Sequence, residues 1–272
     1  MQETPINTCR RHSQLRLFVD LDSKKIFMIS HKCGVALYEH LLSKTYLNKM
    51  DFLQPIPLVH RVGNWYVLIE MDEVSEFVRQ HDETEYSKMM ITRNPYDRLT
   101  SFYANSFWDH ALKKNYRKDK LTHYETYSLV YGERYNEVVD QIKTGDFQKG
   151  FNIFMDAVFL NPTPGTLKER ETNDGYGNIH LIPQSDKYRQ EGKAILTDIK
   201  FVDIKDGIPQ GKHANIVLEF LDIEDMIKQP LNLSSMTKEK HKTAWQYFSP
   251  EALEVVNEIY HFDFEDFGYD KH

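Results

Sequence analysis

The chain has 272 residues, with 34 Lys and Arg against 41 Asp and Glu, so its formal net charge is −7. Apolar residues make up 40% and aromatic residues 13% of the sequence, enough for a sizeable core, which excludes a disordered or fibrous protein. The acidic balance argues against a protein that coats nucleic acid. Any polyanionic ligand therefore has to be held by a local cluster of cations.

The cysteine content indicates a reducing compartment. Cys9 and Cys33 are the two cysteines, which cannot build a disulfide framework, and no CxxC spacing suggests a metal site. No apolar stretch has the length of a signal peptide or a membrane span. We therefore expect a cytoplasmic protein without a transmembrane segment.

Short apolar segments alternate with amphipathic ones along the first half of the chain. Buried strands are predicted at residues 25–30, 56–60 and 89–92. Helices are predicted at residues 35–42 and 72–81, at 94–107 with Asn94 as N-cap and Pro95 at the first position, at 147–158, and from Ser249–Pro250 onward. This order favours an α/β fold with a central, mainly parallel sheet. We expect a single domain over residues 1–272, with 161–177 as a long functional loop.

Ligands of such sheets bind outside the carboxyl ends of the strands. Those ends are predicted at 30–34, 60–61 and 93–94, and all three carry polar, cationic or imidazole side chains. At the first, a tight turn with Gly34 and a helix N-terminus would direct backbone N–H groups and Lys32 at an anion. It is not a Walker A loop, because GxxxxGK[ST] is absent. The alternative is a structural turn with an exposed lysine.

The third strand end carries Arg93, whose guanidinium could bind a phosphate through two parallel hydrogen bonds. Ser101 follows about two helical turns later and shares a face with Arg98. The alternative is a capped helix with Asp97 and Arg98 as surface charges. That alternative does not explain why an arginine ends an apolar strand.

These segments resemble the sulfotransferases, and most of all the carbohydrate-modifying, membrane-type branch. KCGVALYEHLL, which begins at Lys32, is similar to the family's PKxGxTSL loop, and ITRNPYDRLTSFY, which contains Arg93, is similar to RxPxxRLxSxY. Two weaker matches follow in the family's order: IHLIPQ, which ends at Gln184, resembles H-x-x-P-Q, and VVNEIYHFDFEDFGY at 255–269 resembles the C-terminal pattern.

The resemblance implies a P-loop-like three-layer fold with a helical, loop-rich second half. It implies 3′-phosphoadenosine 5′-phosphosulfate as donor, 3′,5′-adenosine bisphosphate as product and no metal. The 5′-phosphosulfate would be bound by Lys32, Cys33, Gly34, Val35, Ala36 and Leu37, and the 3′-phosphate by Arg93 and Ser101. His31 replaces the family's proline, and Val35 and Ala36 replace hydroxyl residues, so phosphate contacts there would come from backbone N–H groups.

Sulfuryl transfer needs a cation at the leaving oxygen and a base for the acceptor hydroxyl. Lys32 fits the first role. We expect His60 as the base, because imidazole titrates near neutral pH, with Glu70 and then His31 as alternatives. His31, His180 and Gln184 are predicted near the acceptor or the nucleotide loop; for His180 and Gln184 the alternative is a loop fixed by side-chain hydrogen bonds.

The expected acceptor is a hydroxyl of a saccharide or another small molecule. The cationic run at 113–120 could steer an anionic glycan, or it could be a solvated helix end. Two other functions stay open. Asp20-Leu21-Asp22 resembles the metal-binding DxD of some glycosyltransferases, although a turn is the favoured interpretation. Val35 and Ala36 would also fit a non-catalytic nucleotide-binding module of the same fold.

Overall fold

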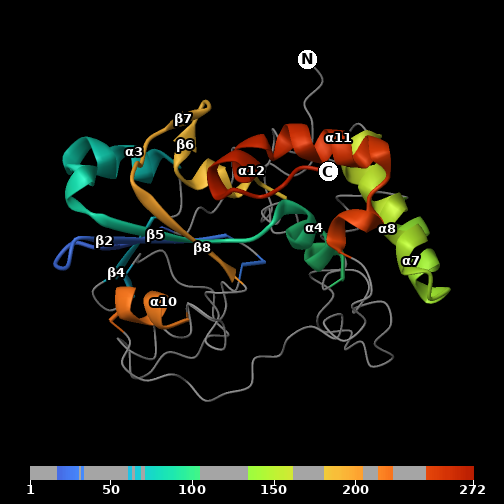
Figure 1. The fold of residues 1–272 in the computed structure, drawn as a ribbon, viewed down its shortest axis with the longest axis horizontal. Helices are drawn as coiled ribbons and strands as arrows, with labels where there is room; N and C mark the ends of the chain where they lie inside the picture. The colour runs from blue at the N-terminus through green and yellow to red at the C-terminus, as the bar shows by residue number, and fades with distance from the viewer. Residues whose placement is uncertain are drawn as a thin grey trace. The chain divides into compact units, whose positions relative to one another are not determined.

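The computed structural model describes residues 17–30, 32–33, 61–62, 65–68, 71–104, 134–161, 181–204, 214–222 and 243–272 (Figure 1). The chain forms two compact units, each described by itself here. The sheet unit comprises residues 13–93 and 184–231, and the helical unit comprises residues 1–12, 94–183 and 232–272. The expectation of a single domain stays a prediction.

The sheet unit is built on a mixed six-stranded sheet in the order β3-β4-β1-β2-β5-β8. Its strands are β1 (Leu17–Asp20), β2 (Lys25–Ile29), β3 (Arg61–Val62), β4 (Trp65–Leu68), β5 (Ser87–Thr92) and β8 (Ile199–Asp203). β2, β5 and β8 are parallel neighbours, whereas β1, β3 and β4 pair antiparallel. β4 therefore runs in the direction of the parallel group, which confirms a mostly parallel central sheet with an antiparallel edge that was not predicted.

Helices flank both faces of this sheet. Figure 1 shows α3 (Met71–Gln80) on one side of the strands and α10 (Ala214–Phe220) on the other. On the α10 side, Phe27 of β2 and Ile91 of β5 pack with Val217 in one buried apolar cluster. A two-stranded hairpin, β6 (Arg189–Gln190) with β7 (Lys193–Ala194), completes the described part of the unit. The α/β class is thus confirmed.

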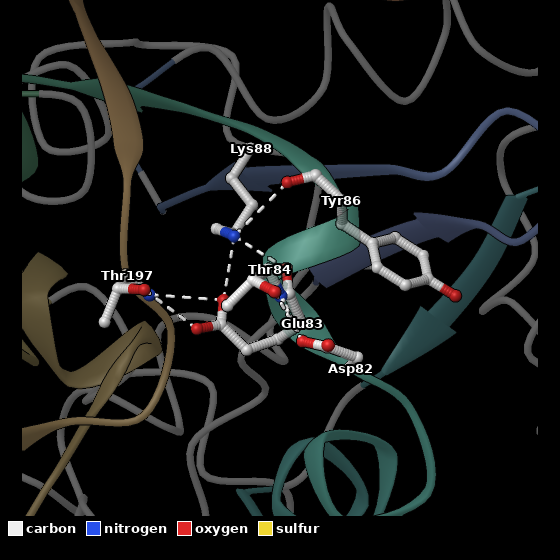
Figure 2. Close-up of polar contacts among 6 residues, drawn as sticks. All are labelled: Asp82, Glu83, Thr84, Tyr86, Lys88 and Thr197. Carbon is white, nitrogen blue, oxygen red and sulfur yellow. Dashed lines mark hydrogen bonds and ion pairs between the residues drawn. The ribbon is translucent and has the colours of Figure 1, made fainter.

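A buried ion pair lies at the amino-terminal end of β5 and links it to the segment before β8. Lys88 Nζ lies 2.7 Å from Glu83 Oε2 and donates to the carbonyl of Tyr86 at 3.2 Å, and its side chain is only 1% exposed. Glu83, on the 3-10 turn η1 (Glu83–Glu85), also accepts a hydrogen bond of 2.8 Å from Thr197 Oγ1, just before β8 (Figure 2). These contacts hold two parallel strands in register at the end opposite the predicted ligand edge.

The helical unit has an aromatic core. Its described elements are α4 (Pro95–Tyr103), α7 (Arg134–Lys143), α8 (Phe147–Met155), the π-helical η4 (Asp156–Leu160), η8 (Ala244–Tyr247), α11 (Pro250–Ile259) and α12 (His261–Phe267). Tyr96 and Phe102 of α4 pack with Phe154 of α8 and Tyr260. The predicted Asn94 cap is present, because Asn94 accepts from Tyr96 N–H, and Ser249 caps α11 by accepting from Ala252 N–H.

Most predicted elements that the structure describes are confirmed: the strands at 25–30 and 89–92, and the helices at 72–81, 147–158 and from Pro250. The helix from Pro95 is confirmed to Tyr103. The helix at 35–42, the strand at 56–60, the cationic run at 113–120 and all but the first residue of 161–177 lie outside the described residues. Among the elements that were not predicted are the strands β1, β4 and β8 and the helices α7 and α10.

The Asp20-Leu21-Asp22 segment forms the turn between β1 and β2. Asp20 Oδ1 accepts hydrogen bonds from the backbone N–H groups of Asp22 and Ser23 at 3.0 and 3.2 Å. The carboxylate is buried and accepts hydrogen bonds within its own turn, so the interpretation of DxD as a turn is confirmed.

In the described part of the chain, no helix has the length and apolar character needed to cross a membrane.

Candidate functional site

The carboxyl ends of β2 and β5 lie side by side. The two strands are parallel, with Ile29 opposite Ile91, so the chain leaves both at the same edge of the sheet. Ser30 and then Lys32 follow β2, and Arg93 follows β5. This is the edge at which open α/β sheets bind ligands.

After β2 the chain forms a tight turn in which Cys33 N–H donates to the carbonyl of Ser30 at 3.0 Å. Lys32 sits in this turn with a φ of 66°, a left-handed conformation that lysine rarely adopts. Cys33 is fully buried in the apolar cluster below the sheet edge. The buried Cys33 therefore anchors the turn, in which Lys32 is half-buried.

Arg93 is linked directly to this turn. Its guanidinium Nη1 donates a hydrogen bond of 2.9 Å to the carbonyl oxygen of Lys32. Like Lys32, Arg93 is half-buried. Two cationic residues from adjacent strand ends are thus held on segments that contact each other, which concentrates positive charge in a chain of net charge −7.

Gln184 joins the same network from a third segment, the 3-10 turn η6 (Gln184–Lys187). Its Oε1 accepts from Arg93 N–H at 2.9 Å and from Cys33 Sγ at 3.1 Å, and its Nε2 donates to the Arg93 carbonyl at 2.6 Å. The side chain is fully buried. Gln184 therefore ties the turn after β2 to the residue after β5 through side-chain hydrogen bonds, which was the alternative predicted for it, and a role near the nucleotide or the acceptor stays a prediction.

Ser30, for which no role was predicted, adds a polar group at the end of β2. Its Oγ is buried at the end of β2 and has no hydrogen-bond partner among the described residues. A buried hydroxyl without a partner is costly. Its place two residues before Lys32 fits a site that receives an anion.

The structure brings together four of the predicted site residues: Lys32, Cys33, Arg93 and Gln184. Ser101 lies half-buried on α4, in the helical unit. The other predicted site residues lie outside the described residues: His31, Gly34, Val35, Ala36, Leu37, His60, Glu70 and His180. Their roles stay predictions.

Arg98 is not a surface charge, contrary to the capped-helix alternative. Its side chain is fully buried; Nη2 donates to the carbonyl of Ile182 at 2.6 Å, and the guanidinium lies 5.4 Å from the centre of the Tyr260 ring. The Tyr260 hydroxyl in turn donates to the carbonyl of Leu181. Arg98 therefore holds the 181–182 segment inside the helical unit.

With this geometry in hand, the comparisons with known proteins identify the family. The model of the sulfotransferase family matches residues 66–270, well over half of the chain, so the chain belongs to the sulfotransferase family. Arg93, Ser101 and Gln184 lie inside the matched region, whereas Lys32 and its turn precede it. No curated protein and no solved structure matches the chain significantly.

Proposed function

We propose that this protein transfers a sulfuryl group from 3′-phosphoadenosine 5′-phosphosulfate to an acceptor hydroxyl, on a saccharide. The family membership supports sulfuryl transfer in general. The observation that favours this donor is the pair of Lys32 and Arg93, held on adjacent strand ends by a hydrogen bond of 2.9 Å. A donor with phosphate groups at both ends of its ribose needs cations at two places.

In the proposed reaction the acceptor oxygen forms a bond to sulfur, the bond from sulfur to the bridging phosphate oxygen breaks, and 3′,5′-adenosine bisphosphate leaves. Lys32 stabilises the negative charge that develops on that oxygen. Arg93, with the predicted help of Ser101, binds the 3′-phosphate and so orients the donor. The Ser30 hydroxyl offers a further hydrogen bond to an anion at the Lys32 turn.

The acceptor hydroxyl gives its proton to a base, for which we propose His60, with Glu70 and then His31 as alternatives. An imidazole at this position would be neutral and able to accept a proton near pH 7. A saccharide acceptor is favoured by the resemblance to the carbohydrate-modifying branch. We also propose a cytoplasmic location and a metal-independent reaction.

The test is transfer from radiolabelled donor to a panel of glycans, small alcohols, phenols and tyrosyl peptides. We expect Lys32→Ala to lower kcat about 100- to 1,000-fold, the usual effect of removing a group that stabilises transition-state charge. Arg93→Ala should weaken binding of 3′,5′-adenosine bisphosphate about 10- to 100-fold. Lys24→Ala is the matched control, because Lys24 also has a positive φ of 53° but lies exposed in the β1–β2 turn.

Three results would contradict the proposal. If Lys32→Ala or Arg93→Ala binds and reacts like the Lys24→Ala control, the site assignment is wrong. If the wild-type protein binds the bisphosphate tightly but sulfates no acceptor in the panel, it is a non-catalytic nucleotide-binding module. If His60→Ala retains full turnover, the base is Glu70 or His31.

A further inference from the structure

We infer that Gln184 is the positioning residue of the donor site: it sets the place of Arg93 and of the Lys32 turn at once, and so determines how well the site distinguishes a nucleotide with a 3′-phosphate from one without. This inference rests on the proposed function. It assigns Gln184 a role without contact to the substrate.

Gln184 forms hydrogen bonds with the Arg93 backbone in the way that a neighbouring strand would. The ladder between β5 and β8 ends at Thr92 opposite Asp203, so the peptide groups of Arg93 lie just beyond it. Gln184 meets both of them, accepting from Arg93 N–H at 2.9 Å and donating to its carbonyl at 2.6 Å. A primary amide has one acceptor and one donor side, which matches a peptide group as a neighbouring strand would.

The same amide oxygen reaches the loop after β2. Oε1 also accepts from Cys33 Sγ at 3.1 Å, and Arg93 Nη1 donates to the carbonyl of Lys32, the residue before Cys33. The contacts therefore close a ring from Gln184 to Cys33, Lys32 and Arg93 and back. Loss of Gln184 removes the bonds that its amide makes to Arg93 and Cys33, so we expect Arg93 and the Lys32 turn to be less precisely placed.

The chemistry of the side chain limits its replacements. Gln184 is fully buried, and its oxygen and nitrogen both have partners inside the protein. Glutamate at this position would keep the acceptor for Arg93 N–H but would place a carboxylate oxygen against the Arg93 carbonyl, where two acceptors repel. Methionine would keep the volume and lose all three hydrogen bonds.

The experiment uses the full chain and titration calorimetry with two probes, 3′,5′-adenosine bisphosphate and adenosine 5′-monophosphate. The dissociation constant of the monophosphate divided by that of the bisphosphate is the ratio that measures recognition of the 3′-phosphate. We expect Gln184→Met and Gln184→Glu to weaken binding of the bisphosphate about 10- to 100-fold and to lower the ratio at least several-fold. Gln190→Met is the matched control, since Gln190 is an exposed glutamine of the sheet unit that pairs with Ser75.

A second measurement separates positioning from general stability. If Gln184 acts through Arg93, Gln184→Met should change the ratio when Arg93 is present but not in an Arg93→Ala background. In that background the guanidinium that would bind the 3′-phosphate is already absent. A purely structural role would lower Tm and leave the ratio unchanged in both backgrounds. If Gln184→Met does not fold, the same two ratios are measured with Gln184→Glu.

The outcomes are distinct. A folded Gln184 variant whose ratio stays within twofold of wild type overturns the inference, while binding of the bisphosphate by the wild type upholds the proposed donor site. An equal change of the ratio with and without Arg93 also overturns it. Failure of the wild-type protein to bind 3′,5′-adenosine bisphosphate overturns the proposed function, and the inference with it.

Discussion

Removing the ammonium of Lys88 should reveal how much the buried ion pair at the start of β5 contributes to stability. Lys88 Nζ lies 2.7 Å from Glu83 Oε2, with side chains 1% and 14% exposed, and Glu83 is bonded to Thr197 as well (Figure 2). In Lys88→Met the methionine fills the space, but the Glu83 carboxylate stays largely buried, and within the described part of the chain its remaining side-chain partner is Thr197.

Breaking a buried pair by removing one partner costs about 3–5 kcal/mol, since the other charge stays buried and unpaired. The loss of unfolding free energy for Lys88→Met should be near the lower value, about 3 kcal/mol, because Glu83 keeps some exposure and two donors from Thr197. Glu83→Gln leaves the less exposed ammonium and should cost at least as much. The double variant, without either charge, should recover part of the loss, with a coupling energy of about 2 kcal/mol.

Urea denaturation of the wild type, both single variants and the double variant measures these free energies of unfolding. Lys24→Met is the matched control, because the Lys24–Glu85 pair is exposed, at 47% and 58%, and exposed ion pairs contribute little to stability. A coupling energy near zero for Lys88 and Glu83, or equal losses for Lys88→Met and Lys24→Met, would refute the reasoning.

Four further outcomes follow from the same structure. Burial raises the pKa of Glu83, but hydrogen bonds from Lys88 and Thr197 outweigh it and hold the pKa below the ordinary 4.5. The stability that the Glu83 carboxylate contributes is therefore complete above pH 4.5 and is lost as the pH falls through the folded-state pKa. The difference in Tm between wild type and Glu83→Gln should therefore shrink in acid. Lys32→Gly should be more stable than Lys32→Ala by about 1 kcal/mol in urea, because glycine adopts the φ of 66° without strain, and both should show the same lowered kcat. Equal stability would contradict the left-handed turn. Gly150→Ala should cost about 1–3 kcal/mol, because its Cβ would strike the buried Tyr103 hydroxyl, and a Tyr103→Phe background should relieve the loss. Ser249→Ala should lower stability by about 1 kcal/mol through loss of the α11 cap, and a glycine there should cost less.

The elements that the sequence predicts well carry their signals locally. β2 and β5 are short apolar runs, and α4 and α11 begin with a capping side chain followed by proline, so neighbours in the chain suffice to find them. β8 was missed because it is only partly buried and contains Lys200 and Asp203, and its pairing with β5 joins distant parts of the chain. Its strand character comes from that partner rather than from its own pattern.

The candidate site was predictable in its residue types and not in its contacts. Lys32 and Arg93 could be placed at one sheet edge, since parallel strands end together. The double hydrogen bond of Gln184 to the Arg93 backbone depends on a segment that returns from far along the chain. The burial of Arg98 likewise depends on Ile182 and Tyr260, neither of which is near it in sequence.

The hydrogen bonds between Arg93 and Gln184 also have a topological meaning. Arg93 is the last residue before the chain leaves the sheet unit, and Gln184 is the residue at which it returns. The Gln184 side chain forms hydrogen bonds with the Arg93 backbone, so the two ends of the segment 94–183 are held together; we call this segment the excursion. The entropy of closing such a loop grows only with the logarithm of its length. The sheet unit should therefore tolerate insertions and deletions in that excursion, provided that its tied ends are left intact.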